Sequence, residues 1–361
     1  MAGEYVIPSP IDPHVHLREP GGEHKEDLVT GTRAAVAGGY VWVGAMPNTN
    51  PTLATVDTLV RFSQRTPGRI WCDVGVHYGA IRENNTESYV SVAGNVFGLK
   101  VYMNHTTGGL LMDDPDTLDR TWAAWPRGAG PILVHGEGGT LEKALALSQK
   151  HDQRLHVCHV SLEEEVDMIR DAKNAGRAVT AEVTPHHLFM TERDRDRYGS
   201  LAVMRPPLGK QSDQDALWKA IHDGTIDMVA TDHAPHTLDE KGHGANMNVN
   251  GIPGLETAVP LMLNAVHQEK LTLDKTVELM HTNPARIFRV PVDESSRTTV
   301  RIGVPRRIDS TEHQTKATWA PYDGWVVNGE VRSVQLRGQT IYDSRAFVGS
   351  PSGRFVVPRS K

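Results

Sequence analysis

The chain has 361 residues, of which 39% are hydrophobic and 23% charged, so it can bury a full core and is not expected to be disordered. Its formal net charge is -6, and no segment is rich in lysine and arginine, which argues against a nucleic-acid partner. Cys72 and Cys158 are too few cysteines for a disulfide framework, so we expect a reducing, cytoplasmic location.

The sequence also argues against a membrane protein. The first residues lack the basic and apolar segments of a signal peptide. The longest apolar run, near residues 40–46, is far too short to cross a bilayer. The net charge of -6 also bears on the substrate. Because the protein as a whole does not attract anions, an anionic substrate would have to be bound by a local group of basic side chains.

In chain order, short β-rich runs alternate with helical stretches, which is typical of βα units around a parallel sheet. The predicted strands end near His16, Met46, Tyr78, Met103, His135, His159, Thr184 and Asp232. Helices are predicted at residues 25–37, 141–150, 162–175, 213–223, 255–268 and 273–286. Eight such strands predict an α/β fold, a closed (β/α)8 TIM barrel over residues 8–290.

The pattern changes after residue 290. Residues 325–343 alternate apolar and polar side chains across turns predicted at Asn328-Gly329 and Arg337-Gly338. They predict a small antiparallel sheet, which residues 4–7 are expected to join. We therefore assign residues 1–7 and 291–361 to a small β-rich subdomain and expect its tail, residues 349–361, to be loosely held.

Several residues suited to a metal site fall at the ends of predicted strands. They are His14, His16, Lys100, His135, His159 and Asp232. Residues i and i+2 of a strand point to the same side, so His14 and His16 can reach one metal. The carboxyl ends of barrel strands meet at one mouth. Imidazoles and a carboxylate there suit a pair of divalent ions, zinc first, which could activate water and polarise a carbonyl.

Each of these residues has a plainer interpretation when it is taken alone. A His-x-His pair is equally compatible with buried histidines that are simply hydrogen-bonded. A lysine is more often a surface or salt-bridge residue, and an ammonium group has no lone pair with which to ligate a metal. Lys100 would first have to be converted into an acceptor. The joint placement at strand ends is what favours a metal centre.

Segments along nearly the whole chain resemble the dihydroorotase family of amidohydrolases. The most specific are HVHLREPG at 14–21, MPNT at 46–49 and TDHAPHT at 231–237. The match continues through GLK at 98–100, CHV at 158–160, EVTPHHL at 182–188 and GIPGLET at 251–257. The likeness is greatest to the dihydroorotase domain of the multifunctional eukaryotic, CAD-type polypeptide of pyrimidine synthesis.

This resemblance implies a zinc-dependent hydrolase of cyclic amides. The reaction would be the reversible cyclisation of N-carbamoyl-L-aspartate to L-dihydroorotate in de novo pyrimidine synthesis. Lys100 would be carboxylated, and its carbamate would bridge two zinc ions. The remaining ligands implied are His14, His16 and Asp232 for one ion and His135 and His159 for the other. Asp232 would also act as general base and then as general acid.

The resemblance further implies a third zinc ion at Cys158, His159 and Glu182. Cys158 could equally be a small buried hydrophobic residue, which is the commoner fate of a free cysteine. The family also implies a homodimer, and it is compatible with a larger polypeptide that holds carbamoyl-phosphate synthetase and aspartate transcarbamoylase.

Other residues resemble those with which the family binds its anionic substrate. Arg18 offers a planar fork for the α-carboxylate, and Asn48 and His236 would add hydrogen bonds to it. Arg205, in the segment MRPP, resembles a further substrate residue. A surface or capping role is the plain alternative for these four residues.

A loop at Thr106 and Thr107 is expected to close over the substrate. Animal members of the family place Thr-Phe where Thr106 and Thr107 stand here. The loss of the aromatic ring and the presence of Gly108 and Gly109 should make this lid looser and more hydrated.

Two other functions compete with this interpretation. A hydantoinase or dihydropyrimidinase shares the barrel, the His-x-His pair and the lysine. It needs no clamp for a ring carboxylate, so Arg18 and Asn48 argue against it. A catalytically inactive homologue that serves as a structural linker would be expected to have lost metal ligands, whereas every ligand position is filled here.

Overall fold

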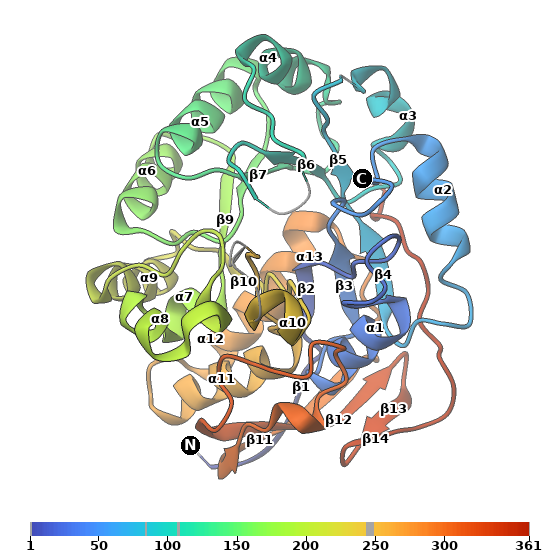
Figure 1. Cartoon of the computed structure of the whole chain (residues 1–361), viewed down its shortest axis with the longest axis vertical. Coiled ribbons are helices and arrows are strands. Elements are labelled where there is room, and N and C mark those ends of the chain that lie inside the picture. Colours follow the sequence, from blue (N-terminus) through green and yellow to red (C-terminus); the bar gives the residue numbers. More distant parts are fainter. Residues whose placement is uncertain (1, 84, 107–108, 243–248, 361) are drawn as a thin grey trace.

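Parallel strands form a ring at the centre of the molecule, and helices surround it (Figure 1). The computed structural model describes residues 2–83, 85–106, 109–242 and 249–360. The strands of the ring are β2 (Ile11–Val15), β3 (Trp42–Ala45), β4 (Asp73–Val76), β5 (Tyr78–Gly79), β6 (Leu99–Tyr102), β7 (Ile132–His135), β8 (Leu155–Val157), β9 (Val179–Val183) and β10 (Met228–Val229). They pair in the orders β2-β3-β4 and β5-β6-β7-β8-β9-β10.

Two seams close these strands into a barrel. At the first, β4 and β5 occupy one strand position that is interrupted at His77, whose Nε2 donates to Pro13 O at 2.8 Å. At the second, Val15 bridges in parallel to His233, and His16 N donates to His233 O at 2.8 Å. Each predicted strand has a counterpart, and the predicted TIM barrel is confirmed. Only β8 and β10 end clearly before the residues predicted.

Most of the helices surround the ring, as the sequence predicts (Figure 1). They are α1 (Leu28–Ala37), α2 (Val56–Gln64), α3 (Tyr89–Val92), α4 (Pro115–Ala124), α5 (Gly139–His151), α6 (Glu163–Asn174), α7 (Pro185–Phe189), α8 (Glu192–Tyr198), α9 (Gln211–Asp223), α10 (Leu238–Gly242), α11 (Leu255–His267), α12 (Leu273–Val277) and α13 (Asn283–Phe288). The single helix predicted at 273–286 is divided, because a π-helical turn, Glu278–Thr282, separates α12 from α13. Pro284 follows that turn, and its missing N–H prevents a continuous α-helical ladder.

A second, antiparallel sheet packs beside the barrel in the order β1-β11-β12-β13-β14. Its strands are β1 (Gly3–Pro8), β11 (Arg297–Arg307), β12 (Val326–Leu336), β13 (Gln339–Asp343) and β14 (Ala346–Phe347). The turn predicted at Arg337-Gly338 joins β12 to β13, and β1 pairs with β11, a strand that the sequence analysis did not predict.

The turn predicted at Asn328-Gly329 is wrong, because both residues lie inside β12. Asn328 N donates to the side-chain oxygen of Asn264 on α11 at 3.0 Å. A Cβ at Gly329 would lie 2.4 Å from Leu263 Cβ. The glycine therefore permits the close approach of a strand to a helix and does not form a turn.

The expectation of a loosely held tail is also wrong. Phe355 bridges in parallel to Val74 of β4, and its ring packs 6.2 Å from the ring of Phe62. Val74 N donates to Arg354 O, and Val356 N donates to Val74 O, both at 2.9 Å. The polar composition of the tail was a poor guide to its order, because backbone N–H and C=O groups can pair with a strand whatever side chains flank them.

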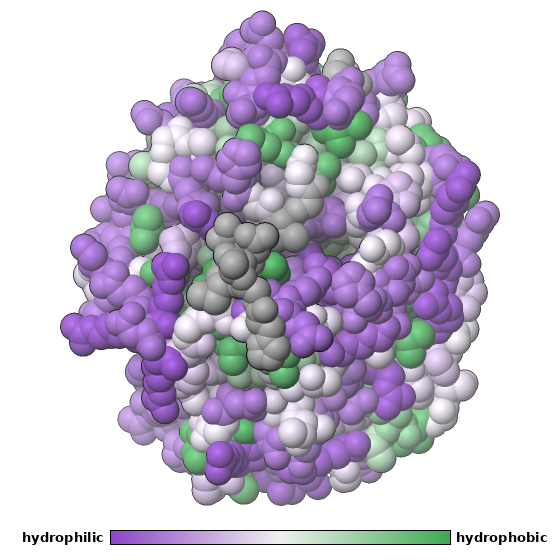
Figure 2. Space-filling model, in the orientation of Figure 1, coloured by the Kyte–Doolittle hydropathy of each residue, from purple (hydrophilic) through white to green (hydrophobic). Residues whose placement is uncertain are grey.

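The face of the molecule seen in Figure 2 is mostly hydrophilic, with hydrophobic residues scattered across it. Within the described ranges, no helix combines the length and the apolar character needed to span a bilayer.

Candidate metal centre and substrate pocket

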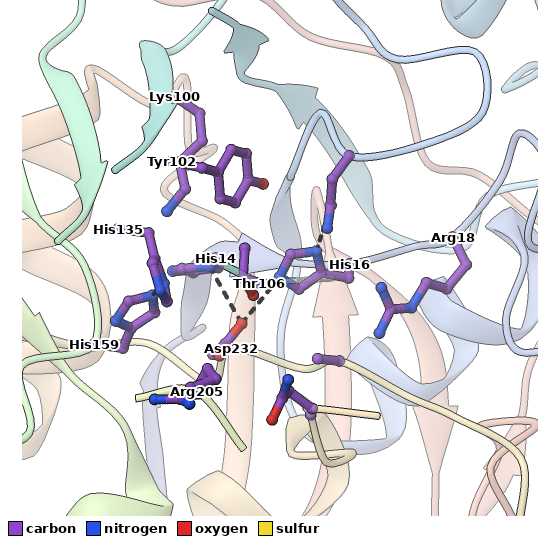
Figure 3. Close-up of a pocket in the computed structure, with 14 residues that line it drawn as sticks. His14, His16, Arg18, Lys100, Tyr102, Thr106, His135, His159, Arg205 and Asp232 are labelled. Carbon is purple, nitrogen blue, oxygen red and sulfur yellow. Dashed lines mark hydrogen bonds and ion pairs between the residues drawn. The ribbon is translucent and has the colours of Figure 1, made fainter. Parts of the chain in front are cut away.

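A pocket opens where the carboxyl ends of the barrel strands meet (Figure 3). It is lined by His14, His16, Arg18, Asn48, Lys100, Tyr102, Thr106, His135, His159, Arg205, Asp232, Ala234, Asn250 and Gly251. The structure therefore brings together most of the residues that the sequence singled out. Cys158, Glu182 and His236 lie outside the lining, and Thr107 lies outside the described residues.

The candidate metal cluster consists of His14, His16, Lys100, His135, His159 and Asp232. Asp232 Oδ1 lies 3.0 Å from His16 Nε2 and 3.3 Å from His14 Nε2. His135 Nδ1 lies 2.8 Å from His159 Nε2. One candidate ligand atom each from His14, His159 and Asp232 fall within 4.8 Å of one another. Five strand ends thus direct nitrogen and oxygen ligands to one place.

The contacts of His16 fit a cation between its ring and Asp232. Its Nδ1 lies 2.7 Å from the side-chain oxygen of Asn48 and must donate to that acceptor. Burial lowers the pKa of His16 to about 4, so the ring is neutral and its Nε2 carries a lone pair. That lone pair faces Asp232 Oδ1 at 3.0 Å. Two acceptors facing each other are the arrangement that a shared divalent ion requires.

His14 also faces Asp232, and in addition both of its ring nitrogens contact carboxylates. Its Nδ1 contacts Glu182 and its Nε2 contacts Asp232. Burial would lower the pKa of His14, but these two carboxylates raise it to about 10. Without a metal the ring is therefore protonated, and a metal at Nε2 would replace one proton. His159 Nδ1 is also buried, with no hydrogen-bond partner among the described residues. The donor set fits a divalent ion.

Lys100 is completely buried, and its Nζ lies 2.9 Å from Cys158 Sγ. Within the described part of the chain, it makes no ion pair with a carboxylate. A buried ammonium without such a partner is unfavourable. Conversion to a carbamate would replace that charge with an oxygen ligand, so the surroundings of Lys100 fit a modified lysine better than a free one.

A second group of possible ligands lies deeper, at His14, Cys158 and Glu182. Its ligand atoms also fall within 4.8 Å of one another, and all three residues are buried. Glu182 also contacts His156 Nε2 at 3.0 Å. Burial would raise the pKa of Glu182, but His14 and then His156 hold it well below its usual range. Glu182 is therefore ionised and already joined to two imidazoles.

Three of the site residues have a left-handed backbone that side chains other than glycine rarely adopt. The φ angles are 61° at Arg18, 36° at His159 and 46° at Asp232. Such strain persists only where the surroundings enforce it, and it is concentrated at functional sites. Around Asp232 the enforcement is visible, because His233 N donates to Thr231 Oγ1 at 3.0 Å. The sequence carries no signal of this feature.

Arg18 and His236 form what we call the carboxylate clamp. Arg18 is buried at the pocket wall, where its Nε donates to Pro235 O at 3.1 Å and its Nη2 lies 3.0 Å from His236 Nε2. Burial, Arg18 and Lys25 together lower the pKa of His236, which keeps the ring neutral and able to accept from the guanidinium. His236 therefore contacts Arg18 directly, and its predicted contact with substrate stays a prediction.

The remaining predicted residues lie at the rim. Thr106 lines the pocket, and Arg205, whose side chain is half exposed, has its Nη1 3.8 Å from Glu137 Oε2. Four lining residues were not predicted from the sequence: Tyr102, Ala234, Asn250 and Gly251. Tyr102 follows Lys100 by two residues on β6, so strand alternation could have identified it. Gly251 begins the matched segment GIPGLET, which could have identified it, whereas Asn250 lies just before that segment and carries no such signal.

Gly251 is required by a close approach of two rim segments. Its φ is 129°, and a Cβ there would lie 2.6 Å from the Cβ of Ala234. Both residues line the pocket. Any larger residue at 251 would push the Asp232 loop away from the rim.

Comparison with known proteins agrees with this geometry. Residues 3–96 match the family model described as "Dihydro-orotase-like". The chain is 41% identical to "Multifunctional protein pyr1-3" of Dictyostelium discoideum, over 93% of this chain and 15% of that protein. It is 35% identical to "Dihydroorotase" of Brevibacillus brevis, over 92% of this chain and 87% of that protein. The chain therefore spans a small part of the multifunctional relative and most of the bacterial one.

Two solved structures share the fold. An L-hydantoinase (dihydropyrimidinase) from Arthrobacter aurescens superposes with a TM-score of 0.91 at 24% identity, covering 98% of this chain and 89% of that one. An "inactive dihydroorotase-like domain" of a Chaetomium thermophilum CAD-like multifunctional protein gives a TM-score of 0.81 at 25% identity, covering 98% of this chain and 99% of that one.

The strands and the cluster at their mouth define a TIM-barrel protein with a candidate metal centre. Within that class, the identity to named dihydroorotases over most of their length decides the family. The chain belongs to the dihydroorotase family.

Proposed function

We propose that this chain is a dihydroorotase, which interconverts N-carbamoyl-L-aspartate and L-dihydroorotate in de novo pyrimidine synthesis. The observation that carries the proposal is the presence, in one pocket, of the metal cluster and a buried guanidinium. The cluster suits hydrolysis of an amide, and the guanidinium suits a carboxylate on the same small molecule. Similarity to named dihydroorotases supports the same substrate.

We propose two zinc ions as the cofactor. His14, His16 and Asp232 would hold one ion, His135 and His159 the other, and a carboxylated Lys100 would bridge them. The buried Lys100 without a carboxylate partner and the opposed acceptors at Asp232 support this assignment. When bound, the ions would polarise the scissile carbonyl and make a water molecule more acidic.

Arg18 and Asp232 have separate roles in the proposed reaction. Arg18 binds the substrate carboxylate and fixes the orientation of the ring. Burial would raise the pKa of Asp232, but His14 and His16 hold it well below the usual range. Asp232 is therefore ionised at neutral pH and can accept a proton from the attacking water. As the ring C–N bond breaks and the new C–O bond forms, Asp232 returns that proton to the departing nitrogen.

A third zinc ion at Cys158, His159 and Glu182 is a separate proposal. The second ligand group supports Cys158 and Glu182 but contains His14 in place of His159. The third site is tested by elemental analysis of fully loaded protein. We expect close to three zinc ions per chain in the unmodified protein and close to two in Cys158→Ala. A count near two in both proteins would contradict the third site while leaving the other two intact.

A hydantoinase activity is the alternative within the same fold, supported by the likeness to the Arthrobacter aurescens structure. Hydrolysis of L-dihydroorotate, followed by ultraviolet absorbance, separates the two functions. We expect activity in the unmodified protein and a fall of about 10- to 100-fold in kcat/KM for Arg18→Ala, because a charge-assisted contact is lost. An unchanged kcat/KM in that variant, with hydantoin hydrolysed faster, would favour the hydantoinase.

An inactive structural domain is the alternative from another class, and the Chaetomium thermophilum domain shows that such domains exist on this fold. In the present chain, however, the ligand positions are filled and their atoms converge. Absence of dihydroorotate hydrolysis in zinc-loaded protein would support the inactive alternative.

We further propose that residues 8–290 form the catalytic unit and that residues 1–7 and 291–361 support it. All residues lining the pocket lie between His14 and Gly251. One contact joins the supporting part to the clamp, since Trp319 Nε1 donates to His236 O at 2.8 Å. The likeness to a multifunctional relative supports a place beside the preceding enzymes of the pathway, and the family resemblance supports a homodimer, which sedimentation would test.

A further inference from the structure

Tyr102 is a buried residue of the pocket whose hydroxyl has no role in the metal cluster or the clamp. It follows Lys100 by two residues on β6, so both side chains point to the barrel mouth. Its side chain is almost completely buried, and its hydroxyl has no hydrogen-bond partner among the described residues. Buried hydroxyls are normally hydrogen-bonded, so an unpaired one in a pocket wall points to a missing ligand.

The hydroxyl is placed between the two parts of the site. In Figure 3 the ring stands beside Lys100, and the hydroxyl is directed to the side of the pocket where His16 and Arg18 lie. Lys100 Nζ lies 5.1 Å from the ring centroid.

Other buried tyrosines show that an unpaired hydroxyl is not the rule in this molecule. Tyr78 donates to Ala54 O at 2.5 Å, and Tyr89 donates to the side-chain oxygen of Asn85 at 3.3 Å. Tyr40 is the closest match to Tyr102, because its hydroxyl is also buried and without a partner in the described structure. Tyr40 does not line the pocket, however, and so provides a matched control.

We propose that Tyr102 is a further substrate-binding residue, whose hydroxyl donates a hydrogen bond to a ring carbonyl oxygen of dihydroorotate while Arg18 holds the carboxylate. This inference rests on the proposed dihydroorotase activity. The carboxylate already has a cationic partner, so the neutral phenol is left for the neutral carbonyl of the same ligand.

Three zinc-loaded proteins test the proposal: the unmodified chain, Tyr102→Phe and Tyr40→Phe. Each is assayed for dihydroorotate hydrolysis, zinc content and thermal unfolding in the absence of substrate. We expect kcat/KM to fall about 10- to 100-fold in Tyr102→Phe, because a substrate carbonyl loses its buried donor. Zinc content should be unchanged, and the melting temperature should be unchanged or higher, because no protein acceptor loses a partner. Tyr40→Phe should match the unmodified chain in kcat/KM.

The outcomes separate the two claims. An inactive unmodified chain would contradict the proposed function itself. With an active unmodified chain, the inference is overturned if Tyr102→Phe keeps kcat/KM within about twofold. It is also overturned if Tyr102→Phe loses activity only together with zinc or thermal stability, because that result would give Tyr102 a structural role.

Discussion

The two sides of the pocket are built in different ways. The metal cluster lies within barrel strands or just beyond their ends. His14, Lys100 and His135 lie in β2, β6 and β7, whereas His16, His159 and Asp232 follow β2, β8 and β10 by one to three residues. The carboxylate clamp lies on loops, and its position depends on side-chain contacts such as that between Arg18 and His236. The candidate metal ligands are therefore positioned mainly by the barrel strands. The residues proposed to recognise the substrate lie on loops, whose positions depend on contacts with other side chains.

Further contacts hold the clamp side. Lys241 is buried and donates to three backbone carbonyls, Val203 O at 2.8 Å, Gly251 O at 3.0 Å and Val249 O at 3.1 Å. Its Nζ also lies 5.5 Å from the ring centroid of Trp319. A single ammonium thus joins two rim segments to the loop that carries the clamp.

The largest expected effect on activity comes from a change in the metal cluster. Lys100→Ala should lower kcat/KM by at least about a thousandfold, because the loss of a bridging ligand removes several kcal/mol of transition-state stabilisation. Zinc content should fall at the same time, while the circular dichroism spectrum stays native. Short-chain carboxylic acids should restore part of the activity if the bridging group is a carbamate. A variant that keeps its zinc and its activity would remove Lys100 from the cluster.

A smaller effect is expected from the contact that joins the rim. Lys241→Met keeps the length of the side chain but leaves three carbonyls without their donor. We expect KM to rise about 3- to 10-fold with a smaller change in kcat, and stability to fall by about 2–3 kcal/mol. Steady-state kinetics and urea unfolding measure the two effects. Equal loss of kcat and kcat/KM, with KM unchanged, would mean that Lys241 acts on the reacting centre and not on the rim.

The smallest expected effect is on the stability of the segment that follows Arg18. Glu19 is buried and accepts from Arg69 at 2.7 and 2.9 Å and from Leu28 N at 3.0 Å. Burial would raise the pKa of Glu19, but the contacts with Arg69 and Leu28 N lower it below its usual 4.5. Its stabilising contribution is therefore complete above pH 4.5 and is lost as the pH falls through the lower value of the folded state.

Glu19→Gln should accordingly be less stable than the unmodified chain at pH 7, and the difference should shrink in increasingly acidic buffer. Urea unfolding of both proteins across this range provides the test. A difference that grows on acidification would contradict the sign of the pKa shift.

The contrast also explains what could be predicted from the sequence. The meeting of His14, His16 and Lys100 in one pocket could be expected, because strand alternation and the convergence of barrel strands are general rules, whereas their role as metal ligands stays a prediction. The contact between His236 and Arg18 could not be predicted, since only the folded loop brings the two side chains together. The positive φ angles of Arg18 and Asp232 and the rim position of Asn250 depend on tertiary contacts that no local pattern encodes.

The same reason accounts for the errors outside the site. Gly329 was taken for a turn residue because Asn-Gly favours hairpins, whereas its role is to let β12 approach α11. The tail was taken for a loose segment because its composition is polar, whereas its backbone pairs with β4. In both cases the deciding partner lies far away along the chain.

The central claim is that the side chains at the barrel mouth hold divalent ions on which the reaction depends. Its most direct test is to strip the protein with a chelator, titrate zinc back and follow bound zinc and dihydroorotate hydrolysis together. The account predicts no activity in the stripped protein and recovery only as at least two zinc ions bind per chain. Full activity in metal-free protein, or a protein that binds no zinc at this site, would contradict it.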